Sequence, residues 1–532
     1  MMDRIVFWGV CLVIVLLPLP FGAVDEWAIF TFEAATFVLF VLHVLGRNPM
    51  GAPSIDLDST GIGRGKQTLS TKTSPGEDSF RTEDSTSHGK VRPSSAIRFP
   101  GWLKALPVVA LAVGLVQLIP LPISIVAALS PRAGVIWRGL SAEGLAGAAG
   151  AGGAGGGWAT LSLVPNFTLY ELVRYVFYFL FAYLVYRHVR TRKRVRTFVF
   201  LLFAAACFQS FYGLAEFFGG TQRIFGFQRE AYMDSATGTF INRNHFAGFL
   251  EMIFPVSVGY LLARASFFDM KRGGSFKERI LWFSQERLQK AVVFGIIPIL
   301  IGVGIFFSRS RTGIFLFFAS IFLMVVALSG AGGRRPEGAE GPGGARGARG
   351  AGAGKRSAKV MRTVLLVVVF AVILIGIRPV IERFSFAALA HEVRPVYFKN
   401  TVEIIKDFPI VGTGLGTYFY AYPMYEEKYS GDLLDHAHND YLELLAESGI
   451  VAGGLMIVVA FGALIWLFAR WSRRSDHLVR GVGLGCLVGI ASILIHSLTD
   501  FNLHITANAV LFVTLYALAL RVVGLNSSKD MR

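Results

Sequence analysis

The chain has 532 residues, of which 53% are hydrophobic and only 16% are charged. This composition excludes an ordinary soluble protein, in which about a quarter of the residues are charged. The net charge of +17 is spread over alternate loops, which argues against nucleic-acid binding. The three cysteines, Cys11, Cys207 and Cys486, lie inside apolar runs without metal-ligand spacing, so they indicate neither a metal nor a redox compartment.

Apolar runs long enough to cross the roughly 30 Å hydrocarbon core recur along the chain. We predict an all-α polytopic membrane protein with about 12 transmembrane helices. The predicted spans are approximately 5–21, 27–46, 101–120, 167–186, 198–218, 245–263, 291–307, 312–329, 363–378, 449–469, 481–498 and 505–523. The first run lacks a small-residue cleavage site and the second follows at once, so we interpret it as a retained span rather than a signal peptide.

Lysine and arginine concentrate in every second loop. The basic stretches are 187–196, 264–290, 334–362 and 470–480. The positive-inside rule then places both termini and these loops in the cytoplasm. The long polar loop 379–448 faces outward, as do 121–166 and 220–243. The basic loops also suit contact with anionic membrane lipids.

Three segments of low complexity separate the apolar runs. Residues 49–99 are predicted to form a disordered cytoplasmic linker, and Gly/Ala tracts occupy 139–157 and 330–354. We favour tolerated insertions over binding roles for all three. The predicted units are residues 1–48 with two spans, the linker 49–99, residues 100–290 with four spans, residues 291–470 including the outer loop, and residues 471–532 with the last two spans.

The end of the outer loop carries the most informative motif, residues 436–443 with the sequence HAHNDYLE. His436 and His438 share a face only if this segment is extended. Asn439 or Asp440 is a candidate N-cap for a short helix that ends at Gly449. A histidine here suits a general base, with a surface or capping role as the alternative. Zinc is a further option, but no third ligand appears at the usual spacing, so we expect no metal.

Arginines form the second group of candidate residues. Arg309 and Arg311 lie in the short outer turn 308–313, where charge is costly unless it is paired or faces water. A guanidinium binds phosphate in a bidentate manner, whereas the alternative is snorkelling to the lipid headgroups. Arg311 is the stronger candidate of the two. Arg394 precedes an amphipathic helix and is the third arginine of interest.

A glycine turn, Gly412-Thr413-Gly414-Leu415-Gly416, follows that amphipathic helix. Its glycines indicate a backbone that approaches something closely, but the Walker lysine of a nucleotide loop is missing. We therefore expect no nucleotide site there.

Two further polar clusters flank outer helix ends. Arg243, Asn244 and His245 lie at the entry to a span, where a structural role is at least as plausible as substrate contact. Residues 496–504 contain two histidines and Asp500, and we favour local helix-end hydrogen bonding for them. Under the predicted topology all the polar clusters face outward. They suggest a cavity in which arginines hold a diphosphate, a histidine activates a hydroxyl, and an apolar body admits a lipid tail.

The order and spacing of these motifs resemble the O-antigen ligase and O-antigen polymerase family of bacterial envelope glycosyltransferases. The resemblance covers roughly residues 290–470 and is carried by 308–313, Arg394, 409–416, 436–443 and 449–454. It implies a GT-C-like membrane fold in the bacterial inner membrane with an active site that faces the periplasm. It also implies inverting transfer without a metal or other cofactor.

The resemblance further implies substrates and residue roles. The donor is an undecaprenyl-diphosphate-linked glycan, and the acceptor is a glycolipid such as lipid A–core or another glycan. Arg311 and Arg394 would hold the diphosphate, with Arg309 as a further candidate. His438 would be the base, with His436 less favoured. The candidate cavity residues are Arg243, Asn244 and Asn439.

Three alternatives stay open at this point. A polysaccharide polymerase and a protein O-oligosaccharyltransferase share the same chemistry and differ only in the acceptor. A transporter for an organic anion, with Arg311 as the substrate clamp, is the alternative from another class. Transporters favour broken helices near the membrane midplane and paired repeats. Here the polar clusters lie at the outer edge and no repeat is visible, which favours the enzyme.

Overall fold

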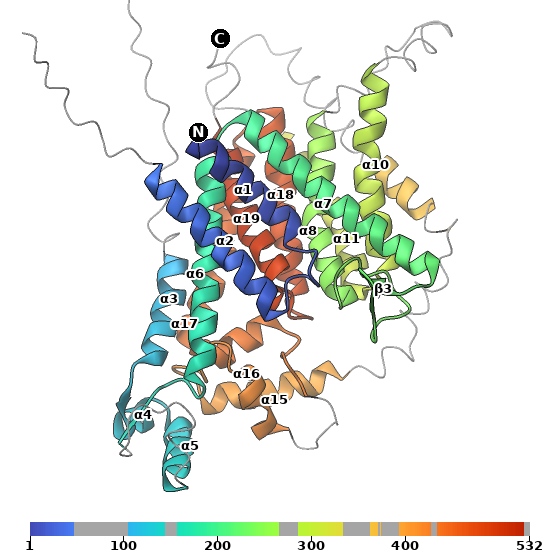
Figure 1. The fold of residues 1–532 in the computed structure, drawn as a ribbon. Helices are drawn as coiled ribbons and strands as arrows, with labels where there is room; N and C mark the ends of the chain where they lie inside the picture. The colour runs from blue at the N-terminus through green and yellow to red at the C-terminus, as the bar shows by residue number, and fades with distance from the viewer. Residues whose placement is uncertain are drawn as a thin grey trace, which may run out of the picture.

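The computed structural model describes residues 1–46, 105–143, 157–264, 286–332, 362–370, 373, 393–426 and 433–525. Within these ranges the protein is a polytopic all-α membrane protein, as predicted (Figure 1). The strands in these ranges form two short antiparallel pairs. They are β1 (Leu121–Pro122) with β2 (Trp158–Ala159), and β3 (Arg223–Ile224) with β4 (Phe227–Gln228).

The remaining elements are helices. In chain order they are α1 (Met2–Leu16), α2 (Glu26–Leu45), α3 (Ala105–Leu118), α4 (Ile123–Leu129), α5 (Pro131–Ala142), α6 (Pro165–His188), α7 (Arg192–Gly219), α8 (Arg243–Ala263), α10 (Glu286–Phe307), α11 (Arg311–Gly332), α15 (Arg394–Asp407), α16 (Tyr418–Ala421), η3 (Tyr422–Tyr425), α17 (Asp440–Ser472), α18 (His477–His496), η4 (Asn502–His504) and α19 (Thr506–Val523).

Eight helices in the described part of the chain are long and apolar enough to cross a membrane. These helices, α2, α6, α7, α8, α11, α17, α18 and α19, coincide with eight of the predicted runs. The runs predicted at 5–21 and 101–120 form α1 and α3, which have 15 and 14 residues. At 1.5 Å per residue such helices reach only about 22 Å, less than a full span. The run 291–307 lies in α10, a helix of 22 residues whose described apolar part is Val293–Phe307.

Several predicted segments lie partly or wholly outside the described residues. The run 363–378 is helical over residues 362–370. The linker predicted at 49–99 is outside, as is most of the tract 330–354. Of the tract 139–157, residues 139–142 belong to the end of α5, and 144–156 are outside.

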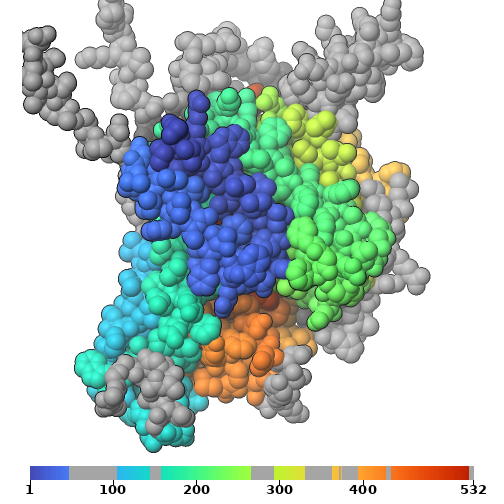
Figure 2. Space-filling view, in the orientation of Figure 1, coloured from blue at the N-terminus to red at the C-terminus, as the bar shows by residue number. Residues whose placement is uncertain are grey.

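Ion pairs gather the basic loops at one end of the helices. Asp3 at the N-terminus lies 2.6 Å from Arg194 and 3.4 Å from Arg190. Arg192 lies 2.9 Å from Asp476 in the α17–α18 loop. The polar clusters 242–248, 308–313 and 496–504 occupy the opposite helix ends, which agrees with the alternation of charged loops. Figure 2 shows α1 and α2 lying across one face of this helical body.

A stripe of glycines joins the two helices that carry much of the site. Gly481, Gly485 and Gly489 follow one another at every fourth position of α18. A Cβ on any of them would lie 2.1–2.5 Å from a backbone oxygen of α8. Small residues at this spacing let transmembrane helices approach backbone to backbone. The antiparallel packing brings the start of α8 beside the end of α18.

Residues of the loops 121–166 and 379–448 together form a separate apolar core at one end of the helical body. Trp137 of α5 packs with Ile404 and Phe408, and the Tyr418 and Tyr422 rings complete the group. Figure 1 shows α4, α5, α15 and α16 at this end, away from the N-terminus. This small core holds the long loop in place before it leads into α17.

The predicted glycine turn packs against a break in α17. Gly449 has φ 77° and ψ 164°, so the helix predicted to end there does end, and a second helical segment continues to Ser472. Thr413 N and Gly414 N donate to the carbonyls of Ala446 and Glu447 at 2.9 and 3.0 Å. These contacts satisfy carbonyls that a helix end leaves without partners. The close approach predicted for the turn is therefore to the chain's own backbone.

Candidate active site

The loop that carries His436 and His438, called the histidine loop below, is fixed at its helical end by Asn439. Its side chain accepts from Tyr441 N and Leu442 N, which makes it the N-cap of α17, as the sequence predicts. The same side chain donates to the carbonyl of Leu498 at 3.1 Å. Asn439 was also a candidate cavity residue, but its amide is used to join the loop to the end of α18.

His438 is held by a buried carboxylate from the next loop. Its Nδ1 lies 3.0 Å from Oδ1 of Asp500, whose side chain is 1% exposed. If Nδ1 carries the proton in this contact, Nε2 is the nitrogen that can accept one. The His438 side chain is 22% exposed.

The backbone at His438 departs from a regular extended segment. Its φ of 53° lies in the left-handed region, which non-glycine residues seldom adopt and which is often found at functional sites. The two histidines consequently pair with different carboxylates, His438 with Asp500 and His436 with Glu443. His436 and His438 therefore do not meet on the common face that a regular extended segment would give them.

Asp500 also collects three side chains from distant parts of the sequence. Asn244 Nδ2 donates to its Oδ2, and an Arg394 N–H lies 3.4 Å from the same oxygen. His245 Nε2 lies 3.8 Å from Oδ1, which is longer than a hydrogen bond. Burial opposes ionisation of Asp500, but the His245 and His438 contacts and the Arg394 charge hold its pKa well below the usual range. Asp500 is therefore a carboxylate around which predicted site residues assemble.

Arg311 begins the helix that lies beside this carboxylate. Its neighbour Thr312 has Oγ1 3.0 Å from Oγ1 of Thr499, the residue before Asp500. A helix N-terminus carries partial positive charge and favours anions. The N-terminal turn of α11 therefore brings its positive end next to the His438–Asp500 pair.

Arg309 and Arg243 belong to a different group. Arg309 lies 2.7 Å from the Asp234 carboxylate and donates to the Asp234 carbonyl at 2.8 Å. Arg243 lies 3.4 Å from the same carboxylate, and its guanidinium stands 4.9 Å from the centre of the Tyr232 ring. Both arginines contact Asp234 in the loop before α8.

His436 belongs to a third group, which includes candidate metal ligands. Its Nδ1 lies 2.7 Å from Oε1 of Glu443, and Nε2 of His504 lies 3.2 Å from the same oxygen. Ligand atoms of these three residues all lie within 4.8 Å of one another. The sequence spacing did not reveal a third ligand, because His504 comes from η4, beyond α18.

His504 is tied to a second carboxylate. Its Nδ1 lies 2.9 Å from Oδ1 of Asp440. Burial alone lowers the pKa of this imidazole, but the charge of Glu443 and the hydrogen bond and charge of Asp440 raise it to about 10. Without an ion, His504 is therefore cationic at neutral pH.

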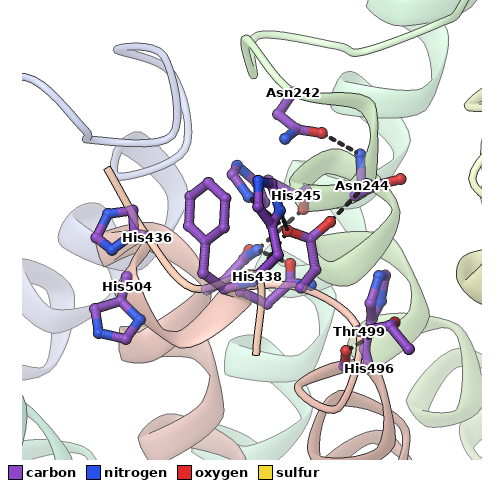
Figure 3. A network of polar contacts seen from close by, with 12 residues as sticks. Asn242, Asn244, His245, His436, His438, His496, Thr499 and His504 are labelled. Atoms are coloured by element: carbon purple, nitrogen blue, oxygen red, sulfur yellow. Dashed lines mark hydrogen bonds and ion pairs between the residues drawn. The ribbon is translucent and has the colours of Figure 1, made fainter. Parts of the chain in front are cut away.

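Phe501 stands between the two histidine groups. Its ring centre lies 4.5 Å from that of His436 in a stacked arrangement and 4.8 Å from that of His438, edge to face. Figure 3 shows His436 and His504 together on one side, with His438, His245 and Asn244 in a separate group. One aromatic ring thus divides two carboxylate-centred clusters.

A cavity of about 560 Å³ opens onto the His436 side. Aromatic rings cover much of its wall, from Phe30, Phe167, Tyr170, Tyr418, Phe419 and Tyr420. Its other lining includes His436, His504, Glu443 and Glu447. Among the described residues that line it, the predicted arginines 309, 311 and 394 are not included. The expected cavity lined by those arginines is therefore not this one.

The sequence did not predict the roles of two residues in the loop after α18. For Asp500 and His504 it favours local helix-end hydrogen bonds, whereas in the structure both contact side chains from distant parts of the chain. The signal was present in the sequence Asp500-Phe501-Asn502-Leu503-His504, which sets an acid and an imidazole in an outer turn. Their partners could not be identified from the sequence because they lie on α8, α15, α17 and the loop that carries His438.

Part of the chain is similar to a known domain family. Residues 296–457 match the family model described as O-antigen ligase. No curated protein matches the chain. The matched segment includes Arg309, Arg311, Arg394, His436 and His438, whereas Asp500 and His504 lie beyond it. The match covers less than a third of the chain, and it supports a function of the O-antigen ligase and polymerase type in general.

Proposed function

We propose that the protein transfers a glycan from an undecaprenyl-diphosphate carrier to an acceptor hydroxyl at the periplasmic face of the bacterial inner membrane. The observation that carries this proposal is the pairing of His438 with buried Asp500, beside Arg394. A partly exposed imidazole oriented by a carboxylate suits proton abstraction from a hydroxyl. The family match implies the lipid-linked glycan.

The proposed step forms one bond and breaks one. The acceptor oxygen attacks C1 of the donor sugar from the face opposite the diphosphate, so the configuration at C1 inverts. The hydroxyl proton passes to Nε2 of His438, and the bond from C1 to the diphosphate oxygen breaks. Asp500 keeps the ring in the correct tautomer and stabilises the imidazolium that forms. Undecaprenyl diphosphate leaves with the electron pair of that bond.

Arginines, rather than a metal ion, hold the leaving diphosphate in this proposal. Arg394 adjoins Asp500, and a guanidinium has five N–H donors, so its contact with the carboxylate is compatible with binding phosphate oxygens. Arg311 stands at the positive end of α11. A hydrogen bond to a charged group contributes about 1.5–3 kcal/mol, and such interactions aimed at developing charge often dominate catalysis.

Substitution of the base and of one arginine tests the proposal. His438→Ala and Arg394→Ala should abolish glycan transfer from a lipid-diphosphate donor by the full chain in liposomes. The matched controls are His477→Ala and Arg473→Ala, whose exposed side chains lie at the opposite helix ends. All four variants must insert and elute as the wild type does. Normal transfer by either site variant would show that its assigned role is wrong.

Glycan analysis of a deletion strain identifies the acceptor. Loss of long polymer from lipid A–core with accumulation of lipid-linked polymer indicates a ligase. Single repeats or short chains indicate a polymerase, and loss of glycan from envelope proteins indicates a protein O-oligosaccharyltransferase. Normal envelope glycan together with loss of anion uptake would contradict the proposal and support a transporter.

A further inference from the structure

We propose that His436, Glu443 and His504 form a binding site for a divalent transition-metal ion, with an open coordination position toward the 560 Å³ cavity. Two imidazoles and one carboxylate are a ligand set found in zinc sites that keep a position for water or substrate. This site is separate from the diphosphate contacts of the proposed function. Its test measures ion binding and does not depend on glycan transfer.

The three ligand atoms already converge on one point. His436 Nδ1 and His504 Nε2 lie 2.7 and 3.2 Å from the same oxygen, Oε1 of Glu443. In a tetrahedral site with bonds of about 2.0–2.1 Å, ligand atoms stand roughly 3.3 Å apart. Entry of an ion therefore requires the contact between His436 Nδ1 and Glu443 Oε1 to lengthen by roughly 0.6 Å, while ligand atoms of all three residues lie within 4.8 Å of one another.

Backbone and side-chain contacts orient two of the ligands. Oε2 of Glu443 accepts from Ala437 N at 2.8 Å, which directs Oε1 toward the histidines. Asp440 Oδ1 lies 2.9 Å from Nδ1 of His504, which leaves Nε2 for the ion. Asp440 is in turn fixed by Leu503 N, which donates to its Oδ2 at 3.1 Å. A carboxylate behind a ligating histidine is the usual outer support of a metal site.

Charge at the cluster also favours a cation. The Glu443 and Asp440 side chains are 1% and 5% exposed, and buried carboxylates need a positive partner. The His436 and His504 side chains are 28% and 22% exposed and line the cavity, so an ion has a path of entry. An oxygen donor from a glycan in the cavity could occupy the open position.

Titration of the detergent-solubilised full chain with ZnCl₂ tests the inference, and CoCl₂ supplies an absorption spectrum that reports coordination geometry. We expect one ion per chain and a rise in the thermal unfolding temperature. His436→Gln, Glu443→Gln and His504→Gln should each remove this binding, and Asp440→Asn should weaken it roughly 10- to 100-fold. The matched control is His438→Gln, which removes an imidazole two residues away on the same loop and should bind as the wild type does.

Three results would overturn the inference. They are failure of the wild type to bind either ion, unchanged binding by all the ligand variants, and equal loss of binding in the His438→Gln control. If the buried Glu443→Gln variant does not fold, the two histidine variants and the wild-type titration still decide the question. Size-exclusion elution of each variant shows which of them are folded.

Discussion

His436 and His438 leave the same short loop, yet they enter different electrostatic surroundings. His438 meets one buried carboxylate, Asp500, which already has an arginine and an asparagine as partners. His436 shares Glu443 with a second histidine, and another carboxylate lies behind that histidine. Phe501 stands between the two groups.

This difference between His436 and His438 shows that the surrounding side chains determine what chemistry an imidazole can perform. On the His438 side Oδ1 of Asp500 lies 3.0 Å from His438 and 3.8 Å from His245, so only His438 is within hydrogen-bond distance, and positive charge comes from an arginine. Such a ring can take up a proton and return it. On the His436 side two rings converge on one oxygen, which is a geometry for holding a cation. The following predictions test whether the His438 group and the His436 group have these different roles.

The largest expected effect comes from Asp500→Asn. The amide keeps the shape but cannot stabilise an imidazolium at His438, so transfer should fall about 10²- to 10⁴-fold. Zn²⁺ binding to the His436 side should be retained. The measurement is initial transfer rate with purified protein, alongside an ion titration of the same sample. A variant with wild-type transfer would remove Asp500 from the mechanism.

The two arginines of the 308–313 turn should differ. Arg311→Ala should lower transfer roughly 10- to 100-fold, the equivalent of one charge-assisted hydrogen bond. Arg309→Ala should change the rate much less, because Arg309 is bound to Asp234 in another loop. Rates of the two variants measured side by side give the comparison. A larger loss for Arg309→Ala would reverse the assignment.

Packing of α8 on α18 should hold Asn244 beside Asp500, the partner of His438. In Gly485→Ala the new methyl group would meet the Pro255 carbonyl at 2.5 Å, so the helices must separate. Such overpacking costs about 1–3 kcal/mol. Gly454→Ala on α17 is the control, because a Cβ there has nothing within 4 Å. Thermal unfolding should fall only for the α18 variant, and transfer should fall with it because α8 carries Asn244.

The smallest expected effect is in the dependence on pH. The pKa of Asp500 is lowered in the folded protein, so its stabilising contribution is complete above the unfolded value of about 3.9. It is lost only as the pH falls through the lower folded value. The difference in unfolding free energy between the wild type and Asp500→Asn should shrink as the pH falls below about 4. A difference that stays unchanged between about pH 5 and 3 would contradict the assignment.

Local patterns predicted much of the fold and part of the site. Hydropathy located the eight long helices, and the Asn439 cap and the Gly449 break followed from residue type. The partner of His438 could not be predicted in this way, because His438 precedes α17 and Asp500 follows α18, so their contact depends on how these two helices pack. The third candidate ligand, His504, was hidden for the same reason. Spacing along one segment reports local geometry, whereas these contacts depend on how separate helices pack.

Hydrogen bonds join the histidine loop and the start of α17 to the loop after α18 at several positions. Asp440 N donates to the Ser497 carbonyl at 3.0 Å, Asn439 to Leu498, and Leu503 N to the Asp440 side chain. One residue inserted between Asp500 and His504 would shift His504 away from Asp440 while Asp500 stayed beside His438. The number of residues in this loop is therefore itself a determinant of the site, and a change in length would uncouple the two clusters without altering any of their side chains.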